Sequence, residues 1–498
     1  MAMRLVQIIP SGTNWSPELD DRAQIRASLD RLSLDLNERG LGWADVSLLW
    51  LASSRRMTGE AGAIATVQQE FDSLVVDTLT EFCGQQGSWP SLIGSTVKAG
   101  FGFSDTMKES DIGDGLMWVA FTHQLLRRIP LGVAITAKDS SERRDAGRLA
   151  LQRAVDGVTA DINAKLDLSL DAVRACAGAL GIIFTSGSGH IAGPESDVDF
   201  RDCYGVGQGL LQEARSLELT LTGGCASNRV PEQSQCLYYS TETSGDGLEY
   251  RATYDYGAVV AVLPAAQALV QLDHPYTRDS DQRLTLTFDP HEQYSEGRYF
   301  CVRSINGRPP REFLEEHWGH ITKQEFQTMV DERSPIPAKP AAHYFSIASS
   351  DDPNPMSLWP NIPIYFEKVG GEVMLRLVRA ESEDAYFYPI RMTPDQLIHN
   401  AEDLRDSLEV NAGPGDSLVA FLCESRKYVL EELGSNEEVE TMARARAEAG
   451  NVVGVYLNGE YSTGEERSIG YHNYSQIGVI FNEGTVEDLP SDWVPGAH

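Results

Sequence analysis

Positive charge is scarce in this sequence, and that scarcity excludes several kinds of partner. The chain of 498 residues carries 41 Lys and Arg against 73 Asp and Glu, a formal net charge of −32 at pH 7. Such a charge repels nucleic-acid phosphates and anionic lipid head groups. We therefore expect neither a nucleic acid nor a membrane as a partner. Adaptation to a salty environment would produce the same acidity.

Cysteine pairs and long apolar runs are also missing. The seven cysteines include no Cys-x-x-Cys pair, which favours a reducing compartment and disfavours a structural zinc site or a redox dithiol. The longest apolar stretch, 258–272, contains Pro264 and Gln267 and is shorter than the roughly 20 residues of a membrane-spanning helix. The N-terminal segment has no secretory or transit pattern. We expect a soluble, cytoplasmic protein.

A globular composition accompanies a repeated order of elements. Hydrophobic residues make up 42% of the chain and charged residues 23%, as in ordinary folded domains. A strand-like apolar run, a helical stretch, a second strand ending in glycine and small polar residues, and a closing strand occur in this order over residues 46–121. The order returns over 180–263 and 417–481. Three occurrences predict a mixed α/β protein built from repeated β-α-β-β units with mixed sheets.

The linkers between these units suggest the domain organisation. We expect a lead-in strand and helix over residues 1–45, then an N-terminal domain with two units over 46–270. A second domain spans 271–498 and contains the third unit at 417–481. The charged, periodic segment 138–165 predicts a helix that connects the first two units. The chain thus forms two lobes that meet near residue 270.

Small polar residues follow the second strand of the repeated units, and we take them as candidate ligand contacts. Glycine allows a backbone to approach a ligand closely, and the neighbouring hydroxyl and amide groups add neutral hydrogen-bond partners. The alternative for each residue is a tight turn with solvated side chains. The candidates in the first two units are Ser95, Thr96, Gly224, Cys225, Ser227 and Asn228.

Charged residues near the strand ends supply further candidates. Arg426, like Arg55 and Arg56, follows the first strand of its unit, where an arginine can clamp a carboxylate; the alternative is an ion pair with an acidic side chain. Glu460 and Glu465 flank the last turn.

We take the two glutamates, together with Tyr456, as candidates to receive the amine of an amino acid or another cation. The alternative is that these residues belong to a solvated loop without a ligand. His472 and Asn473 follow, with the histidine as a hydrogen-bonding or pH-sensitive contact or a structural residue.

Several segments together resemble one known family. Residues 90–96 (PSLIGST) and 221–228 (LTGGCASN) are similar to the strand-and-turn segments of FIST N domains. Residues 304–312 (SINGRPPRE) and 453–465 (VGVYLNGEYSTGE), the latter followed by GYHN, resemble elements of FIST C domains. In order, these segments span most of the chain. The sequence therefore resembles the FIST family, a FIST N domain followed by a FIST C domain.

The resemblance implies a sensory, ligand-binding protein of signal transduction. We expect it to bind a small, amino-acid-like metabolite without a cofactor and to signal through a separate protein of kinase, chemoreceptor or cyclase type, since no such motif occurs in this chain. Because haem binding has been associated with some FIST proteins, a haem-based nitric oxide sensor with His472 as axial ligand is the alternative. A protein-interaction scaffold is a third possibility.

An enzyme is the alternative from another class. Cys225 and Cys423 lie at comparable strand ends, where backbone N–H groups could activate a thiolate for a hydrolase or transferase. Neither has a recognisable His and Asp arrangement, so we expect no catalysis. His317 and His320 lie on one helical face but have no third ligand in the sequence, and we expect no metal site.

Overall fold

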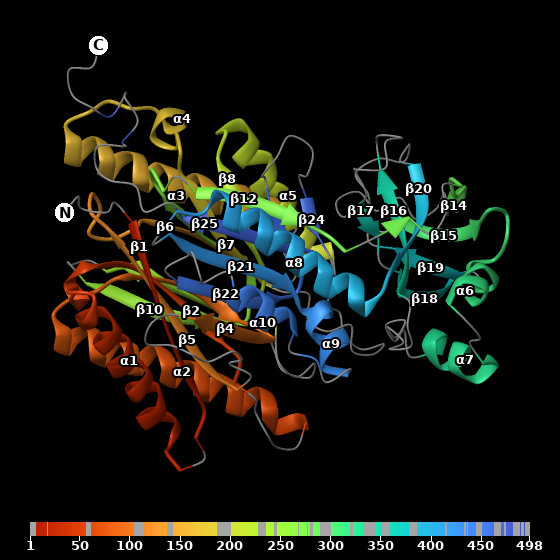
Figure 1. Ribbon diagram of the computed structural model, residues 1–498, viewed down its shortest axis with the longest axis horizontal. Coiled ribbons are helices and arrows are strands. Elements are labelled where there is room, and N and C mark those ends of the chain that lie inside the picture. Colours follow the sequence, from red (N-terminus) through yellow and green to blue (C-terminus); the bar gives the residue numbers. More distant parts are fainter. Residues whose placement is uncertain are drawn as a thin grey trace.

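The computed structural model confirms a mixed α and β architecture with mixed sheets. A large body contains three units that are alike in topology, and a small lobe is inserted in the third (Figure 1). The structure describes residues 6–16, 18–55, 61–103, 114–136, 143–186, 201–227, 236–243, 247–266, 268–275, 277–278, 282–288, 300–318, 322–331, 344–350, 359–361, 363–369, 371–377, 386–413, 416–432, 435, 437–444, 451–462, 470–472, 475–481, 489 and 493.

Unit 1 begins with a strand and a helix that precede the predicted repeat. Its elements are β1 (Val6–Asn14), α1 (Asp21–Glu38), the 3-10 turn η1 (Trp43–Asp45), β2 (Val46–Ser53), α2 (Ala61–Gln86), β3 (Ser91–Thr96), β4 (Ala99–Phe103) and β5 (Gly115–His123). Helix α1 is capped by Asp20, whose side chain accepts a hydrogen bond from the Ala23 N–H. It buries Ile25, Leu29 and Leu36 along one face.

Units 2 and 3 repeat this order. Unit 2 comprises β6 (Leu131–Thr136), α3 (Arg143–Leu166), α4 (Ala172–Ala175), β7 (Leu180–Thr185), α5 (Arg201–Ser216), β8 (Thr220–Cys225), β9 (Leu237–Glu242), β10 (Leu248–Thr253) and β11 (Tyr256–Leu263). Unit 3 comprises β12 (Ala268–Asp273), α8 (Pro394–Asn411), β21 (Ser417–Cys423), α9 (Glu424–Glu432), α10 (Glu437–Arg444), β22 (Asn451–Leu457), β23 (Glu460–Ser462), β24 (Gly470–His472) and β25 (Gln476–Phe481). The expected connecting helix, α3, is thus the leading helix of unit 2.

The three sheets of the large body share one strand order. In unit 1 the closing strand β5 lies between β1 and β2, and β2 pairs in parallel with β3. The orders β6-β11-β7-β8 and β12-β25-β21-β22 are the same arrangement in units 2 and 3. Each parallel pair is joined through a helix, as parallel strands require. The structure therefore contains a threefold internal repeat.

Each unit also lends a strand to another unit. Strand β4 of unit 1 pairs with β22 of unit 3, and β23 of unit 3 pairs with β8 of unit 2. Strand β9 of unit 2 in turn pairs with β3 of unit 1, so the strand exchange runs through all three units in a cycle. None of the three sheets is complete without a neighbouring unit.

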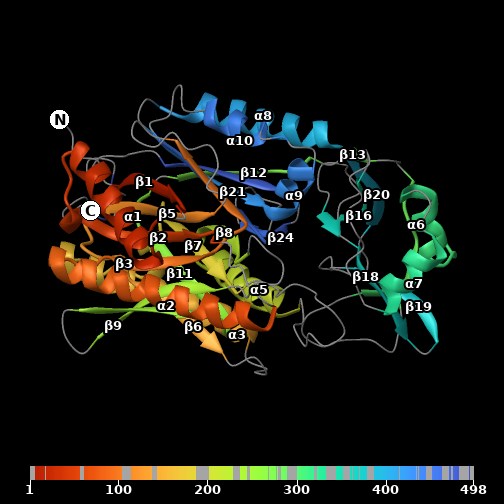
Figure 2. The same ribbon diagram turned by 90° about the horizontal axis from the view of Figure 1, so that it is seen from below.

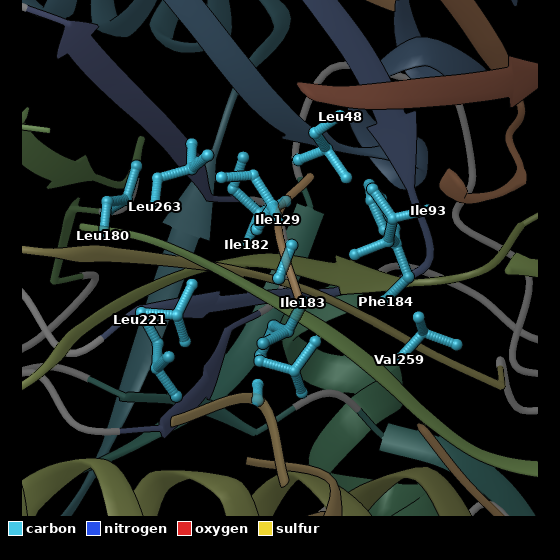
Figure 3. Packing of buried hydrophobic residues seen from close by; sticks show 14 of the residues in the cluster. Leu48, Ile93, Ile129, Leu180, Ile182, Ile183, Phe184, Leu221, Val259 and Leu263 are labelled. Carbon is cyan, nitrogen blue, oxygen red and sulfur yellow. The ribbon is translucent and has the colours of Figure 1, made fainter. Parts of the chain in front are cut away.

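Strands β2, β7 and β21, one from each unit, are buried on both faces. All residues of β2 are buried, and side chains alternate between the two faces of a strand. Trp50 faces the other sheets, where its ring lies 5.7 Å from Phe184 and 5.5 Å from Phe421. The resulting core cluster combines residues of all three units. Figure 3 shows part of it, including Leu48 of unit 1 and Phe184 of unit 2.

Helices cover the outer faces of the three sheets. Leu49 and Leu51 of β2 pack with residues of α1 and α2 in a separate cluster. Helices α3 and α5 pack against the sheet of unit 2, and α8 against that of unit 3. In Figure 2, α8 and α10 lie on one side of the sheets and α2 and α3 on the other. Each sheet therefore has an inward face toward the other sheets and an outward face toward helices.

The small lobe lies at one end of the long axis (Figure 1) and has its own apolar cluster. Its elements are β13 (Thr277–Arg278), β14 (Leu286–Phe288), β15 (Phe300–Ile305), α6 (Pro310–Trp318), α7 (Lys323–Asp331), β16 (Tyr344–Ser350), β17 (Trp359–Asn361), β18 (Pro363–Val369), β19 (Glu372–Leu377) and β20 (Tyr386–Met392). The expected division near residue 270 falls inside β12, and this strand pairs with β25 in the large body. The segment that stands apart is the insertion between β12 and α8.

Candidate functional site

The three units meet at a ring of backbone hydrogen bonds. The carbonyl of Thr96 accepts from the N–H of Ser227 at 2.9 Å, and the carbonyl of Cys225 accepts from Asn458 at 3.1 Å. The carbonyl of Tyr456 accepts from Lys98 at 2.9 Å. Each unit contributes one acceptor and, two residues later, one donor. These pairs are Thr96 and Lys98 in unit 1, Cys225 and Ser227 in unit 2, and Tyr456 and Asn458 in unit 3. We call these three hydrogen bonds the junction ring.

The glycines expected in turns lie inside strands. Gly94 and Gly454 belong to β3 and β22, and Gly224 belongs to β8. This corrects the predicted turns: each second strand continues beyond its glycine because a strand of another unit pairs with it. A Cβ on Gly224 would lie 2.4 Å from the carbonyl oxygen of Gly459. Glycine at this position permits the close approach of β23.

Three residues that were predicted to contact a ligand, Thr96, Cys225 and Tyr456, have side chains on the outward faces of their sheets. The Thr96 hydroxyl accepts from the Cys236 N–H at 3.0 Å, and the Cys225 sulfur lies 3.2 Å from the Tyr461 hydroxyl. Tyr456 donates its hydroxyl to Glu438 at 2.7 Å. These contacts engage all three side chains in the packing of the protein, and their assignment as ligand contacts stays a prediction.

Arg426 is also a structural residue. Its side chain is fully buried, and its Nε donates to Glu438 Oε1 at 2.7 Å. Its other nitrogens donate to Asn400 Oδ1 and the Leu397 carbonyl, each at 2.9 Å. These bonds join α9 to α8 and α10. They neutralise the guanidinium inside the protein, which favours the alternative of an ion pair with an acidic side chain over a clamp on a ligand carboxylate.

Glu460 faces the junction interior. In the register of β23 and β8 it lies opposite Gly224, which shares the inward face with Phe184. Its side chain is fully buried, and Oε2 accepts from the Ser475 hydroxyl at 2.6 Å. Oε1 is buried without a hydrogen-bond partner. Burial raises the pKa of Glu460 well above its usual range, and the charges of Cys225 and Glu424 add to the rise.

Glu424 is a second buried carboxyl group, and the sequence analysis missed it. It follows β21 directly and accepts a hydrogen bond from the Ser227 hydroxyl of unit 2. Burial raises its pKa to about 7, against the lowering effects of the Ser227 hydrogen bond and the Lys98 charge. The available signal was a glutamate at the end of an apolar strand, where parallel α/β proteins place ligand-binding groups.

Two hydroxyl groups extend the polar surface of the interior. Ser95 lies opposite Ala52 in the register of β3 and β2, on the same face as Trp50, and its buried Oγ has no hydrogen-bond partner. Thr222 lies opposite Ile182, on the face of Phe184, and its buried Oγ1 is also without a partner. A buried polar atom without a partner costs about 1–3 kcal/mol. These atoms therefore favour a site that receives a polar group.

We call Ser95, Ser227, Glu424, Glu460 and Ser475 the junction site. It combines three residues predicted from the sequence with two that were missed. The predicted residues Asn228, Glu465 and Asn473 lie outside the described residues. His472 belongs to β24, but its side chain is not described.

Three other sequence-based expectations concern a metal site, a membrane span and a cysteine-dependent enzyme. Over the residues that the structure describes, no group of three or more His, Cys, Asp or Glu is arranged to hold a metal ion, and no helix is both long and apolar enough to cross a bilayer. The Cys225 thiol is buried beside the hydroxyls of Thr185 and Tyr461. The cysteine-dependent enzyme stays a prediction.

Comparison with known proteins adds no family or function. No family model matches the chain, and no curated protein matches it. Among solved structures, T. maritima PurL complexed with FGAR is similar over 96% of this chain and 74% of that chain, with 9% sequence identity and a TM-score of 0.20. A similarity at that level supports no argument about fold or function. Membership of the FIST family stays a prediction.

Proposed function

We propose that this protein reversibly binds a small, amine-bearing metabolite at the junction site. The observation that carries the proposal is the unpartnered, fully buried Oε1 of Glu460. A buried carboxylate is costly unless a charge or hydrogen-bond donor compensates it. A ligand ammonium group supplies both.

The neighbouring groups suit a small ligand of this kind. Ser95 adds a hydroxyl on the inward face, and the aromatic rings of Trp50, Phe184 and Phe421 form the adjacent core. Apolar walls with a few placed polar groups are typical of small-molecule sites. An amino acid or a related primary amine satisfies this chemistry.

Signalling is the second part of the proposal. The junction site draws residues from all three units, so a bound ligand bridges elements that belong to different sheets. A ligand changes an equilibrium between two arrangements only when it binds them with different affinity. Contacts to three units provide such a difference in affinity. The FIST resemblance supports a separate protein as the partner that receives the signal. The haem alternative depends on His472 and stays a prediction.

Native mass spectrometry of the purified protein, compared with its mass after denaturation, tests this function. We expect the wild type to retain an amine-bearing metabolite, or to take one up from an amino-acid and amine mixture, and the Glu460→Gln variant to lose at least tenfold in occupancy. Glu249→Gln removes an exposed carboxylate and serves as the matched control. Equal occupancy in wild type and Glu460→Gln would contradict the proposal.

A further inference from the structure

The junction site buries more negative than positive charge. Glu460 is fully buried and Glu424 nearly so. The Arg426 charge acts on Glu460, but this guanidinium already forms an ion pair with Glu438. The Lys98 charge acts on Glu424, and the Lys98 ammonium also lies 3.3 Å from Glu431. Both cations are thus shared with other carboxylates.

The hydrogen bonds do not compensate this excess of negative charge. Ser227 donates to Glu424, and Ser475 donates to Glu460. Oε1 of Glu460 and Oγ of Ser95 remain without partners. Two carboxylates this deeply buried do not both stay ionised unless a cation joins them. Without a cation, one of the two carboxyl groups holds a proton.

We propose that the ligand's ammonium group and a proton compete for the Glu424–Glu460 pair, so that ligand binding releases a proton to solvent. This inference rests on the proposed function. In the step, the O–H bond of one carboxylic acid breaks, its proton passes to water, and the ammonium group pairs with the resulting carboxylate. No electrons are transferred and no other bond changes.

The direction of the pH dependence follows from the groups that face the pair. Lys98 and Ser227 face Glu424, while Arg426, Cys225, Ser475 and Glu424 itself act on Glu460. Burial raises the pKa of both carboxyl groups. Where the pair holds its proton, exchange of one proton makes the affinity rise about tenfold per pH unit. The rise levels off where the pair is already ionised.

Calorimetric titration of the full-length protein with methylammonium chloride tests the exchange, because methylammonium presents only the proposed group. Titrations below the pKa of Glu424, about 7, where the pair holds its proton, are run in two buffers with different ionisation enthalpies. The buffer dependence of the heat gives the number of protons released. We expect close to one proton per methylammonium bound, tighter binding at higher pH, and loss of the heat in Glu460→Gln but not in Glu249→Gln.

The outcomes separate the two proposals. Methylammonium binding that depends on Glu460 but releases no proton and keeps one affinity across pH overturns the exchange and leaves the proposed function standing. Failure of methylammonium to bind, or binding that is unchanged in a folded Glu460→Gln, overturns both. If that variant does not fold, Ser95→Ala replaces it, with a weaker affinity expected. The proton count needs only the wild type.

Discussion

At the residue scale, two buried glutamates distinguish the junction site from an ordinary core. Glu460 was among the sequence candidates because it follows a strand of the repeated unit, whereas Glu424 was not. What makes Glu424 notable is the Ser227 hydroxyl, which comes from a different unit 197 positions away in the chain. A contact of that separation leaves no local pattern in the sequence. The same reason explains why the partners of Arg426 were not predicted.

Glu424 makes the stability of the protein depend on pH. Burial raises its pKa from 4.5 to about 7, so the folded state holds this proton more tightly than the unfolded state. Its contribution to the free energy of unfolding is complete below its unfolded pKa and is lost as the pH rises through its folded pKa. The loss is about 3 kcal/mol for a fully buried group.

We therefore predict that Glu424→Gln removes this part of the pH dependence. Urea unfolding of the wild type and the variant, from below the unfolded pKa of 4.5 to above the folded pKa of about 7, measures the difference. The wild type should lose about 3 kcal/mol more than Glu424→Gln over that range. Parallel curves for the two proteins would show that Glu424 titrates normally.

At the scale of elements, the exchanged strands connect the units. The sequence predicted the recurring strands and the helices between them because apolar periodicity reports burial. It did not predict that β4, β9 and β23 leave their own sheets, since strand pairing depends on contacts far apart in the chain. It also left the leading strand and helix of each unit outside the repeat: β1 and α1 were expected as a lead-in, and α3 as a connecting helix.

The attachment of β9 illustrates how an exchanged strand is held. Tyr238 of β9 and Tyr254 after β10 donate their hydroxyls to the two oxygens of Asp72 on α2. Burial raises the pKa of Asp72 to about 6, and the two hydrogen bonds act against the rise. The hairpin of unit 2 is thus hydrogen-bonded to a helix of unit 1.

We predict that Tyr238→Phe destabilises the protein by about 1–3 kcal/mol, because Asp72 Oδ1 loses a buried hydrogen-bond donor. The loss should be greater near neutral pH, where Asp72 is ionised, than below the unfolded pKa of 3.8, where both states hold its proton. Thermal or urea unfolding at the two pH values measures it. Tyr239→Phe, the neighbouring tyrosine, is the control. Equal losses in both variants would contradict a specific role for the Asp72 contact.

At the scale of the whole molecule, three similar units form one body and place a polar site where they meet. The repeat was visible in the sequence as a recurring order of strands and helices. The cyclic exchange and the junction ring were not, because they depend on backbone hydrogen bonds, which any residue but proline can donate. The insertion of the small lobe between β12 and α8 was likewise hidden, since its strands resemble those of a separate domain.

A crystal structure of the protein with methylammonium chloride, grown above the pKa of Glu424 beside a sodium chloride control, shows whether the junction site receives an amine. We predict that the methylammonium nitrogen lies within about 3 Å of Glu460 Oε1, inside the junction of the three units. The sodium form should show no such density. Methylammonium bound only elsewhere, or a Glu460 Oε1 already bonded to another group of the protein, would contradict the claim that the junction site receives an amine.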